Sequence, residues 1–414
     1  MEELFEKINQ IPKVEYFDEL ISRLFAAGRA QEAIELCEVC LRGLNLNENP
    51  DVACCFAQKL NHFGHQDRAI ELFEKYNNQN LPHHQVWLLE TAWAHLKNDN
   101  RRVGFDLWQE AVDQDLIQSF VKHNHGAPWI SALPKERFLG KNGDISGKRI
   151  LLVHDGGLGD AIQNVRYVNY LYRDGAAKVF APLNSPLQRL FCESQFDITD
   201  SLINQPADDE WDYIAFPQAI LARYESSQKY TTAFPYLHPQ EPSEHIQSAL
   251  QKINHANIKP KVVIFWRSTT PNRAEPYRSI AISKLAPLLS NSDVDFYTAF
   301  KAGLTQEEIF YLSHFGVTNL GGHIQDMHDL ACIFKEMDLV ISIDSAPIHL
   351  AGAMNIPVYA LISKLTEWRW GQKSNRSFLY PSVTLFRQET LGSWSAPVNQ
   401  IAGKVKSMRA TTHA

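Results

Sequence analysis

The alternation of strand-like runs, tight corners and amphipathic helices constrains the fold of this chain more than any other feature. In GKRILLVHDGGLGDAIQNVRYVNYLYRDGAAKVFAPL, the apolar run at 150–153 meets a glycine-rich corner, a helix-like stretch and a second strand-like run. The pattern restarts with KPKVVIFWRS at 259–268 and continues through VDFYTAF, VTNLG, MDLVISID and IPVYALI. Strands that alternate with helices in this way indicate parallel sheets with helices on their faces.

We therefore predict an α/β protein with two successive Rossmann-like domains that face each other, over residues 148–250 and 251–390. Ligands of such sheets bind outside the carboxyl ends of the strands, so we expect the chemistry in the cleft between the two domains. The sequence leaves open whether the tail at 391–414 returns to the first of these domains. A chain of 414 residues exceeds the usual limit of a single core, which agrees with several domains.

The first third of the chain contains an internal repeat. AAGRAQEAIEL at 26–36 aligns with HFGHQDRAIEL at 62–72, and KNDNRRVGFDLWQEAV is a weaker third copy. Each copy reads as two helices with a small residue where they cross closely, and Gly104 takes this place in the third copy. The pattern, which covers residues 12–118, resembles the tetratricopeptide repeat, whose period is about 34 residues.

Helical repeats of this kind stack into a short solenoid with a concave side, because one unit cannot bury its apolar face alone. A plain helical bundle without a partner surface is the alternative, and the sequence leaves both open. We assign residues 1–120 to this helical domain. Residues 121–147, which mix proline, glycine and polar residues, form a linker.

The composition is that of an ordinary soluble protein, with 44% hydrophobic and 21% charged residues. A formal net charge of −7 argues against a general nucleic-acid binder, which normally carries a basic excess. The sequence shows no signal peptide and no membrane span, so we expect a cytoplasmic protein.

Six cysteines fit a reducing compartment. Cys37 and Cys40 form a C-x-x-C, and Cys54 and Cys55 follow closely, which raises the question of a metal site. Helical apolar spacing around these residues favours packing instead. We therefore predict neither a bound metal nor a resident cofactor.

The first corner, GGLGD, lacks the G-x-G-x-x-G spacing of dinucleotide-binding folds, and no acidic residue follows the second strand at the ribose position. Asp160 at the helix start suits the helix dipole, so it caps the helix or serves as a general base exposed at the cleft. Gly157, Gly159 and Gln163 are the neighbouring residues that we expect on the acceptor side of the cleft.

The second corner lies in DLVISIDSAPIHLAGAMNIPVYALI, where a strand ends and a helix starts around Asp344, Ser345 and Ala346. Pro347 suits the first helical turn. The free N–H groups of the new helix offer a site for a diphosphate, and His349 lies one turn further on. These residue types have no obvious packing reason to occur together at one strand end, so the functional interpretation is favoured.

These stretches, together with YRSIAISKLAPLL and FYTAFKAG, resemble the heptosyltransferase-type (family 9) GT-B glycosyltransferases over about residues 148–390. EWRW at 367–370 is similar to the subset in which tetratricopeptide repeats precede that domain. The resemblance implies a GT-B fold, a nucleotide-diphosphate-sugar donor held mainly by the C-terminal domain, and inversion at the anomeric carbon. It implies that Asp160 is the base and Arg278 a donor-phosphate contact. The donor sugar and diphosphate would bind to Asp344, Ser345, Ala346 and His349.

The chemistry of sugar transfer agrees with the resemblance. A nucleoside diphosphate leaves with growing negative charge, which a helix N-terminus, Arg278 and Lys301 would stabilise without a metal. A metal-dependent enzyme would instead need an acidic D-x-D at a strand end. Asp293 and Asp295 in NSDVDFY match that spacing but precede a strand. The loop at 321–330 is our candidate for the contact with the nucleotide base.

We therefore predict an inverting, metal-independent glycosyltransferase with a nucleotide sugar as donor and a protein or protein-linked glycan as acceptor. The acceptor class rests on the repeats, which commonly engage extended chains. The repeats alternatively only stabilise the enzyme or let it form a homo-oligomer. Other functions that we weigh are a catalytically degenerate GT-B scaffold, a transferase for a lipopolysaccharide-type glycan, and an epimerase or phosphorylase of similar fold.

Overall fold

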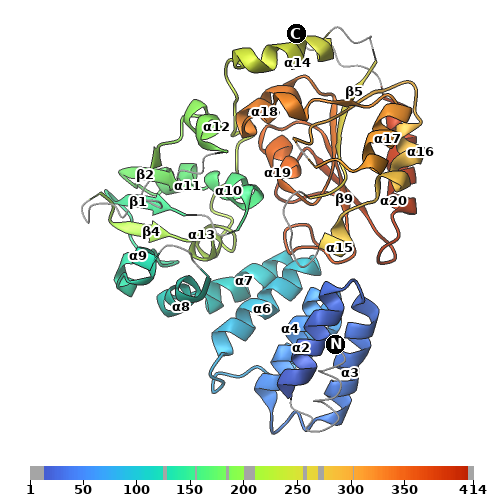
Figure 1. The fold of residues 1–414 in the computed structure, drawn as a ribbon. Coiled ribbons are helices and arrows are strands. Elements are labelled where there is room, and N and C mark those ends of the chain that lie inside the picture. The colour runs from blue at the N-terminus through green and yellow to red at the C-terminus, as the bar shows by residue number, and fades with distance from the viewer. Residues whose placement is uncertain are drawn as a thin grey trace.

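The computed structural model describes residues 14–124, 128–153, 156–182, 186–199, 210–254, 259–268, 275–301 and 303–408. It places a helical region ahead of two α/β regions (Figure 1). Within these described residues, no helix is both long and apolar enough to traverse a bilayer.

The described part of the helical region contains three helix pairs, each joined by a short turn, and one further helix, α8. The helices are α2 (Val14–Ala26), α3 (Ala30–Gly43), α4 (Pro50–His62), α5 (Gln66–Tyr76), α6 (His84–Lys97), α7 (Arg101–Ala111) and α8 (Gln114–Asn124). The turns between the paired helices contain Gly28, Gly64 and Asp99, all with positive φ. The repeat of the sequence is therefore also a repeat of turn geometry.

The small residues of the repeat lie where the paired helices cross. Ala33 and Ala69 are fully buried. A Cβ atom added to Gly104 would stand 2.7 Å from Leu96 Cγ and 3.1 Å from the carbonyl oxygen of Ala92, so only glycine permits this approach of α7 to α6. Tight crossing therefore accounts for the small residue in each copy.

The cysteines of the helical region pack as the sequence suggests. Cys37, Cys40 and Cys54 are buried on helices, among the leucine and phenylalanine side chains of one core. Burial raises the pKa of the Cys37 thiol to about 12, so it stays protonated and is a poor metal ligand.

The first α/β region has a four-stranded parallel sheet in the order β3-β2-β1-β4. Its strands are β1 (Arg149–Leu152), β2 (Lys178–Pro182), β3 (Ile198–Thr199) and β4 (Tyr213–Ala215). Its helices are α10 (Leu158–Val165), α11 (Val168–Arg173), α12 (Gln188–Glu193) and α13 (Pro217–Tyr224). The short elements α9 (Pro128–Ser131) and η1 (Lys135–Arg137) precede it, and η2 (Glu244–Ile246) and α14 (Gln247–Asn254) follow it.

The second α/β region has a six-stranded parallel sheet in the order β10-β9-β8-β5-β6-β7. Its strands are β5 (Lys261–Phe265), β6 (Asp295–Thr298), β7 (Thr318–Asn319), β8 (Leu339–Ile343), β9 (Val358–Ile362) and β10 (Val383–Arg387). Its longer helices are α17 (Gln306–His314), α18 (Met327–Lys335), α19 (Ala346–Ala353) and α20 (Ser395–Val405). The short ones are α15 (Glu275–Arg278), η3 (Ile282–Leu285), α16 (Ala286–Leu289) and η4 (Gly321–His323).

Both sheets have the strand order of a doubly wound Rossmann-like fold. Numbered within its own region, the second sheet reads 3-2-1-4-5-6 from β7 to β10, and the first reads 3-2-1-4. In this fold the chain reverses its winding direction beside the first strand, and ligands bind there at the carboxyl ends. The helices α10 and α19 both start at this position of their sheets.

The C-terminal segment differs from one expectation. A return of the tail to the first α/β region was open from the sequence, but α20 packs against α16, β9 and β10 of the second region. Val398, Ile401 and Val405 form one buried face of α20. This apolar face is covered by the nearest sheet, so the helix completes the second region.

The helical region docks against both α/β regions, with α6 and α7 nearest to them (Figure 1). The Trp108 indole donates a hydrogen bond to the carbonyl oxygen of Gln218 at 3.0 Å, which ties α7 to α13. On the other side, the Asp99 carboxylate accepts a hydrogen bond from the Gln372 backbone N–H at 2.9 Å. Phe25 stacks on Tyr277 with ring centroids 4.8 Å apart.

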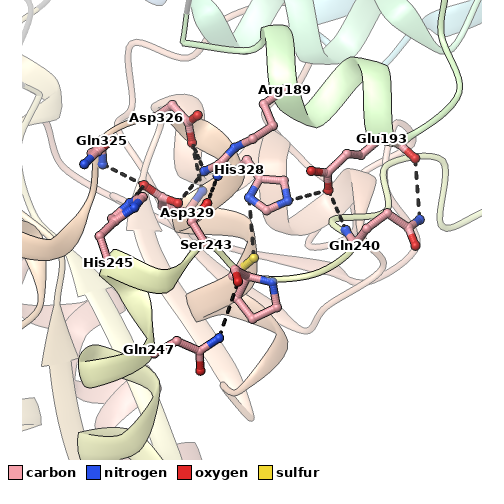
Figure 2. Close-up of polar contacts among 12 residues, drawn as sticks. Arg189, Glu193, Gln240, Ser243, His245, Gln247, Gln325, Asp326, His328 and Asp329 are labelled. Atoms are coloured by element: carbon pink, nitrogen blue, oxygen red, sulfur yellow. Dashed lines mark hydrogen bonds and ion pairs between the residues drawn. The ribbon is translucent and has the colours of Figure 1, made fainter.

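The two α/β regions are joined at another place by a polar cluster around Arg189 of α12 (Figure 2). The Arg189 guanidinium donates to Asp326 Oδ1 at 2.9 Å and also pairs with Asp329, which is fully buried at the start of α18. The neighbouring His328 contacts Glu193 of α12 through Nε2 at 2.5 Å. These bonds connect the first region to the second independently of the helical repeats.

Candidate active site between two strand-to-helix corners

The first corner joins β1 to α10 and is organised by Asp160. Asp160 Oδ2 accepts a hydrogen bond from the Gly157 backbone N–H at 2.9 Å, so this side chain caps its own helix. Asp160 Oδ1 forms an ion pair with Arg369 Nη1 at 2.8 Å. Burial alone would raise the pKa of Asp160, but Arg369 and the Gly157 hydrogen bond hold it below its usual value. The carboxylate is therefore ionised at neutral pH.

The three glycines of this corner have different surroundings. Gly156 has a φ of +106°, and an added Cβ would stand 2.9 Å from Asp160 Cγ, so a side chain would displace the carboxylate. At Gly159 an added Cβ would stand 2.8 Å from His349 Cδ2. Gly157 alone of the three faces open space. Two of the glycines thus serve close packing. Of the two glycines that we expected on the acceptor side, Gly157 has open space and Gly159 packs against His349.

The second corner joins β8 to α19 and has no internal cap. Ser345 is the N-cap residue, yet its side chain accepts no hydrogen bond from the helix. Its hydroxyl instead donates to the carbonyl oxygen of Ile343 at 3.2 Å. Pro347 stands in the first turn. Pro347 has no N–H, and the Ile348 N–H donates to the Ser345 carbonyl oxygen at 3.0 Å. The N–H of Ala346 is therefore the one that the first turn offers to a ligand, and the helix dipole favours an anion there.

Asp344 directly follows β8 and keeps some exposure to solvent. Its pKa is raised to about 6, because burial disfavours the charged form and outweighs the opposing charge of Arg369. Arg278 reaches the same corner, where its Nη1 donates to the Asp344 carbonyl oxygen at 3.4 Å. The predicted donor contacts Arg278, Asp344 and Ser345 thus lie together, with Ala346 as the first residue of α19.

His349 lies on α19 against the first corner and is 3% exposed. Its Nδ1 shares a hydrogen bond of 2.8 Å with the hydroxyl of Tyr380, which is fully buried. Burial lowers the pKa of His349 to about 3, with Arg369 acting in the same direction. The imidazole is therefore neutral and links the two corners by packing beside Gly159.

Lys301 lies elsewhere. It follows β6, and its Nζ donates to the carbonyl oxygen of Gln325 at 3.3 Å. It therefore contacts the loop at 321–330, which we expect to bind the nucleotide base. In the described part of the chain, no bond joins Lys301 to the α19 corner. The D-x-D spacing of Asp293 and Asp295 lies at the start of a strand, because Asp295 is the first residue of β6.

A pocket of about 250 Å³ opens beside Asp160 where all three regions of the chain meet. The predicted Gln163 lines it. The remaining lining residues are His62, Trp93, Lys97, Trp108, Asn164, Pro217, Gln218, Leu221, Glu367, Trp368 and Arg369. A larger hollow of about 570 Å³ lies at the amino ends of β6 and β7, opposite the edge at which such sheets bind ligands.

Arg369 is the main site residue that the sequence reasoning missed. It is near both corners, because it pairs with Asp160 and its charge acts on Asp344. The one available signal was EWRW, in which an arginine stands between two tryptophans after β9. In the sequence, this stretch indicated only a family resemblance and no role for Arg369.

Asp326, His328 and Asp329 bring their ligand atoms within 4.8 Å of one another, the spacing of a metal site. Arg189 and His245 already occupy the carboxylates, and Figure 2 shows their bonds converging there. His245 Nε2 lies 2.7 Å from Asp329 Oδ2. An arginine in the centre of the cluster takes the place of a cation, so these residues do not fit a metal.

Comparison with known proteins supports an enzyme of sugar transfer. Residues 217–394 match the sequence profile of glycosyltransferase family 9 (heptosyltransferase). Protein FlbA of Caulobacter vibrioides is 26% identical over 310 residues, which are 67% of this chain and 49% of FlbA. The chain thus spans about half the length of this curated relative.

Two of the solved structures that are similar to this chain are enzymes named as transferases. ADP-heptose LPS heptosyltransferase II of E. coli is 13% identical with a TM-score of 0.42, and the match covers 63% of this chain and 98% of that one. The Thermobaculum terrenum O-GlcNAc transferase is 12% identical with a TM-score of 0.31, over 95% of this chain and 90% of that one. The profile match contains the α19 corner and Arg278 but not Asp160, which lies before it.

Proposed function

We propose that this chain, whose residues 217–394 match the family 9 profile, moves a sugar from a nucleoside diphosphate to a protein or protein-linked glycan, with inversion at the anomeric carbon and without a metal. The observation that carries the proposal is the meeting of two unlike corners. One holds an ionised carboxylate, and the other presents an uncapped helix start beside Arg278.

The donor end of the reaction belongs to the α19 corner. The diphosphate accepts a hydrogen bond from the Ala346 N–H at the start of α19, the helix dipole favours its negative charge, and Arg278 balances that charge. When the bond between the anomeric carbon and the phosphate oxygen breaks, the electron pair goes to the diphosphate. Fixed dipoles and an arginine stabilise that charge as it develops, so no metal ion is needed.

The acceptor end belongs to Asp160. An acceptor hydroxyl attacks the anomeric carbon from the side opposite the diphosphate, because base and leaving group stand on different domains. This single displacement inverts the configuration. The hydroxyl proton passes to the Asp160 carboxylate late in the step, since Arg369 keeps the pKa of this group low.

The polypeptide part of the acceptor rests on the helical region. Residues of α4, α6 and α7 line the pocket at Asp160, so an extended chain bound along the helix pairs would present a residue or a glycan to the base. We place this reaction in the cytoplasm, where reducing conditions suit the six unpaired cysteines.

The proposal is tested by measuring nucleotide release from a panel of UDP-, ADP-, GDP- and CMP-linked sugars, with and without EDTA. We expect slow hydrolysis of one nucleoside diphosphate sugar, unchanged by EDTA. Abolition by EDTA and rescue by magnesium would contradict the metal-independent step. No binding of any nucleotide sugar would favour a scaffold instead.

The acceptor class needs a separate test. Deletion of the helical region is unsuitable, because it would expose the apolar contacts of Tyr277 and Trp368. The intact chain is instead given the active donor with a cell lysate. A labelled product that is degraded by protease supports a protein-linked acceptor, and a protease-resistant glycolipid product would establish a lipopolysaccharide-type acceptor.

A further inference from the structure

The pocket beside Asp160 is built by three parts of the chain that are far apart in sequence. Trp93 and Trp108 come from the helical repeats, Gln163 and Asn164 from α10, and residues 367–369 from the second α/β region. The α19 corner does not line it. The pocket is thus on the acceptor side of the base, and the helical repeats form one of its walls.

Two buried amide oxygens of this pocket have no partner. Gln163 is 2% exposed and Asn164 is 4% exposed, yet Gln163 Oε1 and Asn164 Oδ1 accept no hydrogen bond. They stand three and four residues after Asp160, on the same face of α10. A buried acceptor left unpaired costs about 1–3 kcal/mol, so a ligand that donates to these oxygens would recover a deficit already built into the fold.

The opposite wall is aromatic and contains unpaired donors. Trp108 and Trp368 pack together with ring centroids 5.5 Å apart, and Trp93 meets Trp108 at 5.9 Å. Trp93 remains partly exposed, and its Nε1 has no partner, nor does Arg369 Nε. The pocket thus offers an apolar ring wall, two N–H donors and several oxygens that accept hydrogen bonds.

The size and charge of the pocket restrict the kind of molecule that it can bind. The volume of about 250 Å³ is below the roughly 300–1,000 Å³ of pockets for drug-sized ligands, so it suits one small ring. Two cations, Lys97 and Arg369, face two carboxylates, Asp160 and Glu367, which favours a neutral molecule. A serine side chain would supply one hydroxyl and leave amide oxygens unpaired. A sugar ring supplies several hydroxyls and an apolar face for an indole.

We propose that this pocket binds one neutral sugar ring, the terminal unit of a glycan acceptor, with Gln163, Asn164 and Trp93 as its specificity contacts. The proposal rests on the proposed function, which it narrows from a polypeptide or glycan to a glycan. It also gives the repeats a direct part in substrate binding. The hydroxyl that reacts is the one presented to Asp160.

The test uses the full chain and saturation-transfer NMR with methyl glycosides of glucose, galactose, mannose and N-acetylglucosamine as probes. We expect at least one glycoside to bind. Asn164→Leu and Trp93→Phe should weaken binding about three- to tenfold each, the effect of one lost hydrogen bond. Trp129→Phe is the matched control, because Trp129 Nε1 is also buried without a partner but lies outside the pocket.

Thermal unfolding separates a binding role from a structural one. Asn164→Leu removes an unpaired buried oxygen, so its melting temperature should equal or exceed that of the wild type. A lower melting temperature with unchanged glycoside binding would make Asn164 a packing residue and overturn the proposal. Trp93→Phe keeps the test open where the leucine variant does not fold.

The inference would be overturned if the wild-type chain bound none of the glycosides. It would also be overturned if a serine-containing peptide bound to the wild-type chain and Asn164→Leu abolished that binding. The proposed function fails independently, since it predicts donor turnover. Donor hydrolysis without glycoside binding would reject the sugar pocket alone. Glycoside binding without any nucleotide-sugar binding would reject the transferase alone.

Discussion

The α10 and α19 corners have the same architecture and opposite electrostatic states. Each follows a parallel strand beside the point where its sheet reverses direction, and each starts a helix of eight residues. At α10 the Asp160 carboxylate accepts a hydrogen bond from the N–H of the N-cap residue Gly157. At α19 the N-cap Ser345 turns its hydroxyl away from the helix. An internal anion fills the first corner, and the second is left for an external one.

The difference shows how one kind of strand-to-helix corner is suited to two roles, that of a base and that of a diphosphate site. A carboxylate that caps a helix and pairs with Arg369 is ionised and held in one place, as a base must be. An uncapped helix start beside Arg278 is suited to a diphosphate. Gly159 and His349 meet between the corners, so the two proposed sites, for the donor and for the acceptor, lie side by side.

Removal of the Asp160 charge should have the largest effect. Asp160→Asn keeps an oxygen for the Gly157 N–H but cannot take the acceptor proton. We expect the transfer rate to fall about 100- to 10,000-fold, the usual contribution of a general base. Nucleotide binding should be unchanged. Asp106→Asn, at an exposed helix position, is the control for the rate assay, and an unaltered rate in the Asp160 variant would leave its carboxylate as a cap only.

The α19 corner is tested by Arg278→Ala. Loss of one charge-assisted contact of about 1.5–3 kcal/mol should weaken nucleoside diphosphate binding by roughly 10- to 150-fold. Isothermal titration calorimetry with ADP, UDP and GDP measures this directly. Lys284→Ala removes an exposed cation from the same region and should not change the affinity. Equal affinities in all variants would move the phosphate away from this corner.

The glycines of the α10 corner give a stability comparison. Gly156→Ala forces a side chain to φ +106° and against Asp160, so we expect a loss of about 1–3 kcal/mol in the free energy of unfolding. Gly159→Ala should also destabilise, because its Cβ meets His349. Gly157→Ser should be tolerated, since that site is open and serine suits an N-cap. Urea unfolding of the three variants decides whether packing explains the motif.

A smaller effect is expected from pH. The pKa of Asp344 is about 6 in the folded chain, above its ordinary value, so the folded state holds this proton more tightly than the unfolded state. Its contribution to stability is complete at acid pH and is lost as the pH rises to about 6. Nucleoside diphosphate affinity should rise as the pH falls through 6. Asp344→Asn should flatten both profiles, and a slope that persists in this variant must come from another group.

Much of the fold followed from the sequence because its signals are local. Runs such as VVIFW and LVISI predict buried parallel strands, and the small residues of the repeat mark close helix crossings. The path of α20 was open, because an amphipathic helix can cover any nearby apolar face. Its buried side contacts β9 and β10, which its own sequence does not encode.

The site was predictable only where its residues stand at strand ends. Asp344 directly follows a buried strand, and Asp160 and His349 lie in the first turns of the helices that start after such strands, so the topology brings them to one edge. Arg369 and Trp93 come from a loop and a repeat helix, and their place in the pocket at Asp160 depends on how three regions dock. The ion pair of Arg369 with Asp160 spans 209 residues of sequence, and no local pattern announces it.

The most direct test of this account is a crystal structure of the full chain soaked with the nucleoside diphosphate that calorimetry shows to bind. We predict the phosphates within hydrogen-bonding distance of the Ala346 backbone N–H at the start of α19, with Arg278 beside them. The Asp160 carboxylate should still accept from the Gly157 N–H. Phosphates seated at the α10 corner, or far from both corners, would contradict the division of roles between the two helices.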